Sequence, residues 1–445
     1  MKENKTLMQY FEWYLRPENK LWNKAIANAQ YLSAIGITDV WFPPAYKGAG
    51  GKYDVGYSAY DLYDLGEFDQ KGSIETKYGT KEEYINAIKK LHENGIRVYA
   101  DIVLNHKIGA DEPEIVYASE EEQTNRNVDT SLPNGVFRFS GKKWDKNVDA
   151  ENGNYDYLMG ADIDYNNPEV VEEIKKWGKW YVETTNIDGL RLDAVKHIKS
   201  GFMAEFIHEM RKIKKLDCVG EYWNRNLQSL ENYITKTNSS IPLFDVPLHY
   251  NLFEASNSNG NYDMARIFDN TLVKEMPQLA VTFVDNHDTE PGQALFSWIQ
   301  EWFKPLAYSL ILLRKDGLPC VFYGDFYGIP SQNIKPMGEK LEKIIKARKY
   351  FAYGEQIDYF DHHDIIAWVR TGDDEHTDSG MVAILSDGPG GSKMINVGKK
   401  LANTVFYDWL GNVQETVYVD QDGNGIFYCN GGSVSVWVKK ENIYN

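Results

Sequence analysis

Residues 82–106, EEYINAIKKLHENGIRVYADIVLNH, contain the unit that decides the fold. The segment 82–91 is amphipathic with a helical period, and Gly95 follows it as a helix-ending glycine. The next segment, 97–104, is a short apolar run rich in β-branched and aromatic residues, which is typical of a buried strand. A helix followed directly by a buried strand predicts one step of a parallel α/β sheet.

The same alternation continues on both sides of this unit. The sequence predicts strands at 8–13, 38–42, 97–104, 189–193, 216–221, 243–247, 280–284 and 320–323. It predicts helices at 21–35, 82–91, 170–182, 202–213, 227–234, 264–273, 303–313 and 341–351. Such a series over about 350 residues favours an α/β fold with a closed (β/α)8 TIM barrel, and a doubly wound open sheet is the alternative.

Two stretches interrupt the alternation. Residues 105–167 contain few helical signals and many Asp, Asn, Gly and Tyr residues, which predicts a small domain inserted after the third strand. From residue 354 onward, short strand-like runs (365–369, 381–385, 393–397, 404–407, 415–419 and 433–438) are separated by turn signals such as DGPGG at 387–391, which predicts an antiparallel β-sandwich domain. We therefore expect a barrel at 1–104 and 168–353, an insert at 105–167 and a C-terminal domain at 354–445.

The composition narrows the location and the partners. The formal net charge is −17, which argues against nucleic acid and anionic membranes because both require basic patches. The three cysteines, Cys218, Cys320 and Cys429, form an odd and sparse set that suggests free thiols in a reducing compartment. Neither a secretory signal nor an apolar run of membrane-spanning length is visible. We expect a monomer in the cytoplasm.

The predicted strand ends carry acidic side chains. In a parallel barrel, functional side chains gather at the C-terminal ends of the strands. Four of these ends read DIVLNH (101–106), RLDAVKH (191–197), GEYW (220–223) and VDNHD (284–288). A single acid at such an end can be an ordinary solvated group. Several carboxylates at one barrel mouth repel each other and raise at least one pKa, which keeps a carboxylic acid protonated for general-acid chemistry.

Such a set suits the cleavage of a sugar. Two carboxylates about 5 Å apart support double displacement, in which one attacks the anomeric carbon and the other protonates the leaving oxygen. Arg191 lies two residues before Asp193, so on a strand both side chains point to the same face and the guanidinium keeps the carboxylate ionised. His106 and His287 offer donors for sugar hydroxyls, although an isolated histidine is more often held in a structural hydrogen bond.

The chain resembles the α-amylase family of glycoside hydrolases (family 13), particularly the liquefying bacterial type. Four family motifs occur in order, at 101–106, 189–197, 220–223 and 283–289. Further matches are QYFEWY (9–14), PPAYKG (43–48), the stretch 56–68 and NGNYDYL (152–158), so the likeness spans nearly the whole chain. The resemblance implies a retaining endo-hydrolase of α-1,4-glucosidic bonds in starch, glycogen or maltodextrins.

The resemblance also implies a role for individual residues. Asp193 is similar to the nucleophile, Glu221 to the general acid/base, and Asp288 to the carboxylate that stabilises the transition state. The implied substrate-binding residues are the direct partners Arg191, His106 and His287, the aromatic platform Tyr57 with Trp13 near it, and Lys196 and His197 on the leaving-group side.

The family binds calcium between the barrel and the insert. The resemblance implies ligands from the side chains of Asn105, Asp156 and Asp162 and from the backbone carbonyl of His197, which are the oxygen donors that calcium prefers. Turn and cap chemistry is the alternative for these acidic residues. The insert is shorter than in the liquefying type, and Asn166 stands where relatives carry Asp, so one calcium is expected and additional Ca²⁺ or Na⁺ ions are not.

Two other functions use the same motifs. A maltooligosaccharide-forming amylase or an α-glucan transglycosylase would have the same site, and the motifs do not separate them from an endo-hydrolase. A non-catalytic carbohydrate-binding homologue should have lost one of the three carboxylates, and all three are present.

Overall fold

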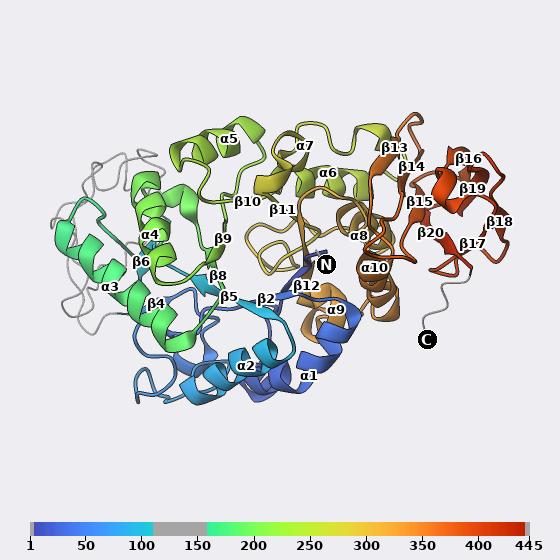
Figure 1. Ribbon diagram of the computed structural model, residues 1–445. Coiled ribbons are helices and arrows are strands. Elements are labelled where there is room, and N and C mark those ends of the chain that lie inside the picture. Colours follow the sequence, from blue (N-terminus) through green and yellow to red (C-terminus); the bar gives the residue numbers. More distant parts are fainter. Residues whose placement is uncertain (1–3, 110–157, 441–445) are drawn as a thin grey trace. The chain divides into compact units, whose positions relative to one another are not determined.

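The computed structural model describes residues 4–109 and 158–440. Eight parallel strands form a closed barrel in the order β1-β12-β11-β10-β9-β8-β5-β2 (Figure 1). Their bounds are β1 Leu7–Gln9, β2 Asp39–Phe42, β5 Arg97–Ile102, β8 Gly189–Leu192, β9 Asp217–Gly220, β10 Leu243–Phe244, β11 Ala280–Phe283 and β12 Leu318–Phe322. The predicted (β/α)8 barrel is confirmed, and the open sheet is not formed.

The chain divides into two compact units. One comprises Met1–Glu12, Ala34–Thr38 and Asp245–Asn445, and the other comprises Trp13–Ser33 and Asp39–Phe244. We call them the C-terminal and the N-terminal unit. This division runs through the series of barrel strands and does not test the three predicted domains, whose boundaries stay predictions. Most of the predicted insert, residues 110–157, lies outside the described residues.

The N-terminal unit contains strands β2, β5, β8, β9 and β10. Its parallel register places Asp101 of β5 opposite Arg191 of β8. Helix α2 begins with a capping box in which Thr80 and Glu83 exchange side-chain and backbone hydrogen bonds, and Gly95 follows it with a φ of +73°. Its helices are α1 Leu21–Ile35, α2 Lys81–Glu93, α3 Pro168–Thr185, α4 Ser200–Ile213 and α5 Leu227–Lys236, at all five predicted places.

Between residues 243 and 273 the structure differs from the prediction in two places. The run 243–247 is not all strand, because the Asp245 side chain accepts a hydrogen bond from the Leu248 N–H at 3.1 Å and starts helix α6. The predicted helix 264–273 is wrong: the chain forms a 3₁₀ turn at Met264–Arg266, and Asn270 has a φ of +56°, which interrupts a helix. The helices of the C-terminal unit are α6 Val246–Asn257, α7 Leu272–Glu275, α8 Lys304–Leu312, α9 Tyr323–Tyr327 and α10 Glu339–Tyr350.

The last part of this unit is antiparallel, as predicted. A six-stranded sheet has the order β13-β14-β15-β20-β17-β18, and β16 pairs with β19 in a second sheet. Ile384 of the first sheet and Ile395 and Phe427 of the second belong to one buried apolar cluster, as in a sandwich. Strands β13 and β19 were not predicted. The bounds are β13 Gln356–Tyr359, β14 Ile365–Arg370, β15 Met381–Ser386, β16 Gly390–Asn396, β17 Val405–Asp408, β18 Val417–Tyr418, β19 Asn424–Asn430 and β20 Ser433–Lys439.

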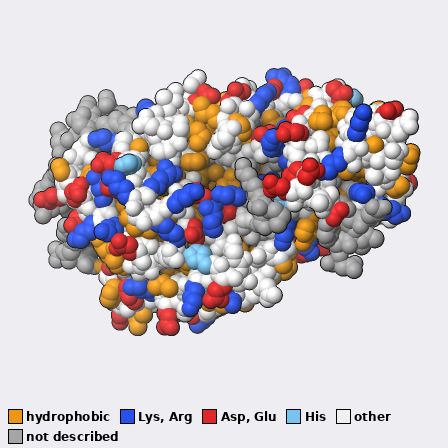
Figure 2. Space-filling model, in the orientation of Figure 1, with side chains coloured by type: hydrophobic (Ala, Val, Ile, Leu, Met, Phe, Trp, Pro, Cys, Tyr) orange, Lys and Arg blue, Asp and Glu red, His pale blue; other side chains and the backbone are white. Residues whose placement is uncertain are grey.

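The charged surface, the character of the helices and the state of the cysteines can be compared with the predictions on partners and location. Figure 2 shows basic side chains interspersed with acidic ones over the face in view. Within residues 4–109 and 158–440, no helix combines the length and the apolar character that crossing a lipid bilayer requires. Cys218, Cys320 and Cys429 are buried and form no disulfide, as the sequence predicted.

Candidate active site

A buried arginine at the end of β8 organises the site in the N-terminal unit. The Arg191 Nη1 donates to Asp193 Oδ1 at 2.5 Å and to Asp101 Oδ1 at 3.0 Å. Its Nη2 lies 3.0 Å from Glu221 Oε2. Because Asp193 and Glu221 directly follow neighbouring strands β8 and β9, the barrel itself brings the two predicted catalytic carboxylates to one guanidinium.

The electrostatics of this cluster keep the arginine charged. Burial disfavours a charged guanidinium, but the carboxylates around it, Asp101 and Glu221 foremost, outweigh burial and raise the pKa of Arg191 well above its usual value. Burial likewise raises the pKa of Asp101, and Arg191 opposes that rise. One cation among three acids leaves the pocket with an excess of negative potential, which suits a reaction that builds positive charge on a sugar ring.

Asp101 is a site residue that the sequence did not single out. Besides Arg191, its carboxylate accepts hydrogen bonds from Trp41 Nε1 at 3.0 Å and from the Tyr57 hydroxyl at 2.8 Å. It therefore fixes both the arginine and an aromatic ring. Asp101 begins one of the quoted motifs, but only the pairing of β5 with β8 shows that it faces Arg191.

Two aromatic rings stand beside the carboxylates. The rings of Trp13 and Tyr57 are stacked with an interplanar angle of 1° and centroids 6.0 Å apart. The Trp13 carbonyl accepts a hydrogen bond from Lys77 Nζ at 3.2 Å, and the Tyr57 carbonyl lies 2.8 Å from His106 Nε2. Both rings are partly exposed, so they offer apolar faces to a ligand.

His106 is neutral and oriented by its neighbours. Burial lowers its pKa. Its Nε2 donates to the Tyr57 carbonyl, and its Nδ1 accepts from Asn105 Nδ2 at 3.2 Å. The structure thus shows the structural hydrogen bond that was the alternative for this histidine, and contact with a sugar stays a prediction.

Lys196 and His197 lie in the turn after the nucleophile candidate. The turn is a short 3₁₀ helix, Val195–His197, and Ala194 before it has a φ of +47°. The Ala194 N–H donates to Glu221 Oε2 at 3.1 Å, so this turn also holds the acid/base candidate. Lys196 lines a cleft of about 350 Å³ together with Tyr222 and residues of α5.

The predicted calcium ligands are partly described. The Asn105 Oδ1 is buried and finds no hydrogen-bond partner within the described ranges, while its amide nitrogen is used by His106. Strand β7 (Ala161–Asp162) pairs with β6 (His106–Lys107) and places the buried Asp162 beside this end of β5. An amide oxygen without a donor next to a carboxylate is suited to a hard cation. His197 is described, and Asp156 lies outside the described residues.

The C-terminal unit carries the third carboxylate. In the loop after β11, His287 Nδ1 accepts from Gln9 Nε2 at 3.1 Å, which leaves the ring proton on Nε2. That nitrogen lies 3.3 Å from Asp288 Oδ2. His287 is buried and Asp288 is partly exposed. The loop thus presents one carboxylate with a histidine donor attached to it.

A second group of side chains of the kinds that bind metal ions was not predicted from the sequence. One ligand atom from each of His362, His363 and Asp364 lies within 4.8 Å of the others. Asp387 is buried, and neither of its carboxylate oxygens has a hydrogen-bond partner among residues 4–109 and 158–440. Burial and the charge of Asp364 raise the pKa of Asp387 to about 6.

Comparisons with known proteins show the family of this chain. The family described as "Alpha amylase, catalytic domain" matches residues 22–362, and "Alpha-amylase C-terminal" matches residues 384–438. The chain is 52% identical to an α-amylase of Geobacillus stearothermophilus, over 98% of this chain and 87% of that protein. It is 49% identical to a glucan 1,4-α-maltohexaosidase of Bacillus sp. strain 707, over 98% and 93% respectively.

A cytoplasmic α-amylase of Escherichia coli is 43% identical, over 99% of this chain and 100% of that protein. Among solved structures, an Anoxybacillus α-amylase superposes with a TM-score of 0.70 at 19% identity, covering 98% of this chain and 97% of the other. At that identity the superposition shows the shared fold.

Proposed function

Because this chain belongs to the α-amylase family of glycoside hydrolases, we propose that Asp193 and Glu221 perform its chemistry. The protein hydrolyses α-1,4-glucosidic bonds of α-glucans, as its named relatives at about half identity indicate. We assign it endo-cleavage with retention of configuration. The observation that supports this assignment is the shared guanidinium of Arg191, which holds the two carboxylates side by side.

The reaction then proceeds in two displacements. In the first, the Asp193 carboxylate attacks the anomeric carbon while Glu221 donates its proton to the glycosidic oxygen, so the leaving chain departs and a covalent glycosyl-enzyme forms. In the second, Glu221 takes a proton from water, whose oxygen attacks the same carbon and releases Asp193. Two inversions at one carbon leave the product in the α-configuration.

The surrounding residues prepare these groups. Arg191 Nη2 and the Ala194 N–H both contact Glu221 Oε2, so we assign the acid proton to Oε1. Asp288 stabilises the positive charge of the transition state. Arg191, His106 and His287 orient the reacting sugar, Tyr57 and Trp13 stack against it, and Lys196 and His197 contact the leaving chain.

Calcium would be held by Asn105, Asp162 and the His197 carbonyl, with Asp156 as a further ligand. The partnerless Asn105 oxygen supports this site. Bound calcium supplies a fixed positive centre that joins the end of β5 to the turn after β8. Asn166 Oδ1 accepts from Lys199 Nζ at 2.7 Å, so this uncharged amide oxygen already has a cationic donor, and we expect no additional Ca²⁺ or Na⁺ ion there.

We also make proposals on the length of the products, the cellular location and the oligomeric state. The maltohexaosidase relative keeps a maltooligosaccharide-forming enzyme as a second candidate, with transglycosylation as a variant. The products formed from soluble starch over time separate these activities. The buried free cysteines and the relative named cytoplasmic support the cytoplasm, with maltodextrin or glycogen as substrate and a monomeric enzyme.

The assignment of the two carboxylates can be tested by azide rescue. Asp193→Ala and Glu221→Ala should both lose starch hydrolysis while retaining their folded circular-dichroism spectra. With an activated aryl maltooligoside, azide should give the β-glycosyl azide with Asp193→Ala and the α-glycosyl azide with Glu221→Ala, because azide replaces the nucleophile in the first and water in the second. Asp217→Asn, at the start of β9, is the control that should keep full activity. The opposite pattern of azides would exchange the two roles.

A further inference from the structure

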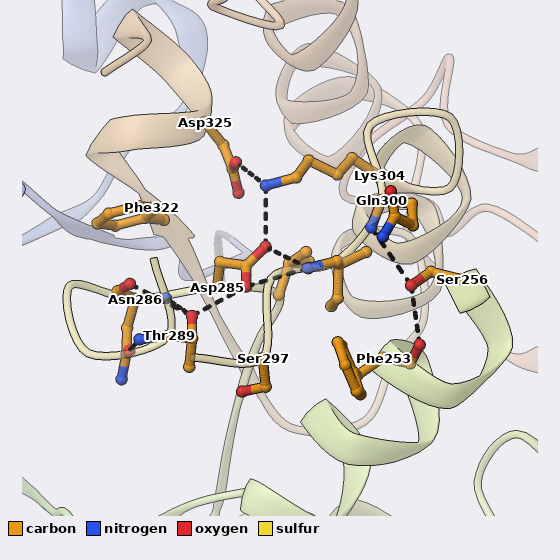
Figure 3. Close-up of polar contacts among 12 residues, drawn as sticks. Phe253, Ser256, Asp285, Asn286, Thr289, Ser297, Gln300, Lys304, Phe322 and Asp325 are labelled. Carbon is orange, nitrogen blue, oxygen red and sulfur yellow. Dashed lines mark hydrogen bonds and ion pairs between the residues drawn. The ribbon is translucent and has the colours of Figure 1, made fainter. Parts of the chain in front are cut away.

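Lys304, Asp285 and Asp325 form a buried ion cluster next to Asn286 and Thr289 (Figure 3). Lys304, the first residue of α8, is 2% exposed. Its Nζ lies 2.8 Å from Asp285 Oδ2 and also pairs with Asp325 Oδ1. Asp325 sits in α9 directly after β12 and also accepts from the Tyr308 hydroxyl at 2.6 Å. The cluster therefore connects the loop after β11 to the end of β12.

Lys304 is an unfavourable residue for its position unless it has a special partner. A cation in the first turn of a helix opposes the helix dipole, and a buried ammonium loses its hydration. The compensation comes from the two carboxylates and from the Trp298 ring, whose centroid lies 3.2 Å from Nζ. The Lys304 ammonium, which also pairs with Asp325, therefore holds the Asp285 carboxylate from one side.

Asp285 passes this constraint to the catalytic loop through one hydroxyl. The Thr289 Oγ1 donates to Asp285 Oδ1 at 2.9 Å and accepts from the Asn286 N–H at 3.0 Å. The Asn286 side-chain oxygen accepts from the backbone N–H groups of Asp288 and Thr289, each at 2.9 Å. These bonds tie the backbone N–H groups of Asn286, Asp288 and Thr289 to the turn and, through Thr289, to the ion cluster.

We propose that Lys304, Asp285 and Thr289 are positioning residues that set the backbone of Asp288 for catalysis. The inference rests on the proposed function of Asp288. The Thr289 hydroxyl is the group to test, because it bonds both to the carboxylate of Asp285 and to the backbone of the turn. A small displacement of Asp288 changes the distance to the charge that it stabilises, so the effect should fall on the chemical step.

Thr289→Val removes the hydroxyl and keeps the shape. We expect kcat on an aryl maltooligoside to fall about 10- to 100-fold, the range for a misplaced catalytic group, with KM changed less than about threefold. Thr289→Ser should restore kcat. The control is Thr271→Val, because Thr271 is equally buried in the same unit and its hydroxyl donates to the Phe268 carbonyl at 2.7 Å, away from the loop.

A double-mutant cycle separates positioning from general damage. Asp288→Asn alone should lower kcat strongly, and adding Thr289→Val should lower it no further because the carboxylate to be positioned is already gone. If Asp288→Asn keeps activity, the proposed role of Asp288 fails. If Asp288→Asn is inactive but Thr289→Val matches Thr271→Val in kcat, the positioning inference fails while the proposed function stands. Multiplicative losses in the double variant also overturn the inference.

Discussion

Replacing Arg191 by methionine is the most demanding test of the site. The side chain is fully buried and its two terminal nitrogens contact Asp101, Asp193 and Glu221. Two unit charges about 4 Å apart interact by about 4 kcal/mol at an effective dielectric constant near 20, and most of this is offset by the cost of burying them. Removing one partner leaves the acids uncompensated, which costs about 3–5 kcal/mol of folding free energy.

For a protein of 445 residues, with an unfolding entropy of about 2.1 cal/mol/K per residue, that loss corresponds to a fall of about 3–5 °C in the melting temperature. We expect kcat to fall at least about 100-fold, since one preorganised donor at a reacting group contributes that much. Arg191→Lys should be less destabilised and still impaired, because one ammonium cannot replace both nitrogens of the guanidinium. Calorimetry and steady-state kinetics measure the two effects.

The loss of stability in Arg191→Met should depend on pH. Burial already raises the pKa of Asp101, and without Arg191 it rises further. A carboxyl group whose folded pKa is raised stabilises the fold at low pH and loses that contribution as the pH rises through the folded value. The stability deficit of Arg191→Met should therefore be larger at pH 8 than at pH 5. A deficit that does not change with pH, or normal kcat, would refute the electrostatic role.

A matched control is available in the same unit. Arg97 at the start of β5 bridges Asp39 at the start of β2 and Asp217 at the start of β9, at 2.5 and 2.7 Å. Arg97→Met should lose stability and keep kcat. A loss of kcat comparable with that of Arg191→Met would show that the barrel, and not the site, responds to the substitution.

Two further predictions concern the cation site and an ion pair at the base of the barrel. A chelator should lower the melting temperature of the protein, by the equivalent of about 3–4 kcal/mol if the free calcium concentration is well above the dissociation constant. Asn105→Ala should lower the melting temperature by itself, and chelator should then have no further effect. An unchanged melting curve would remove calcium from the proposal. At Asp188, burial would raise the pKa, but hydrogen bonds from His92, the Val98 N–H and Lys214 lower it to about 2. The stability that this ion pair contributes is present above the unfolded pKa near 3.9 and is lost as the pH falls toward 2. In urea unfolding, Asp188→Asn should therefore destabilise the protein by about 1–2 kcal/mol at pH 7 and by much less at pH 2.5. An equal deficit at both pH values would contradict the ion pair.

Much of the barrel could be predicted because local signals agree with it. Helix α2 has a capping residue, an amphipathic period and a terminal glycine, so its bounds follow from nearby residues. The run 243–247 was ambiguous, because a short apolar stretch fits a strand or a buried helix. Its Asp245 and Pro247 are typical of a helix start, and the structure shows that they begin α6. Strand β19 was missed because its first two residues, Asn424 and Gly425, belong to the glycine-rich turn signal QDGNG at 421–425.

The candidate site could be predicted only as far as neighbouring residues determine it. Arg191 and Asp193 are two positions apart on one strand, so their contact followed from the period of a strand. The contacts of Asp101 with Arg191 and of Lys304 with Asp285 join residues on different elements. Such pairs depend on the register of the assembled barrel, which one sequence does not encode locally.

The pairing of β1 with β12 has a consequence for synthesis. Leu7 pairs with Cys320 and Gln9 with Phe322, and the Asn4 side chain donates to the carbonyls of Arg348 and Ala352. The first strand to leave the ribosome therefore waits for the last barrel strand. At about 5–20 residues per second, this wait lasts about 15 to 60 s. During that time the edge of β1 that faces β12 has no partner, although β2, its other neighbour in the closed barrel, has already been made. This open edge needs protection from aggregation until translation is nearly complete.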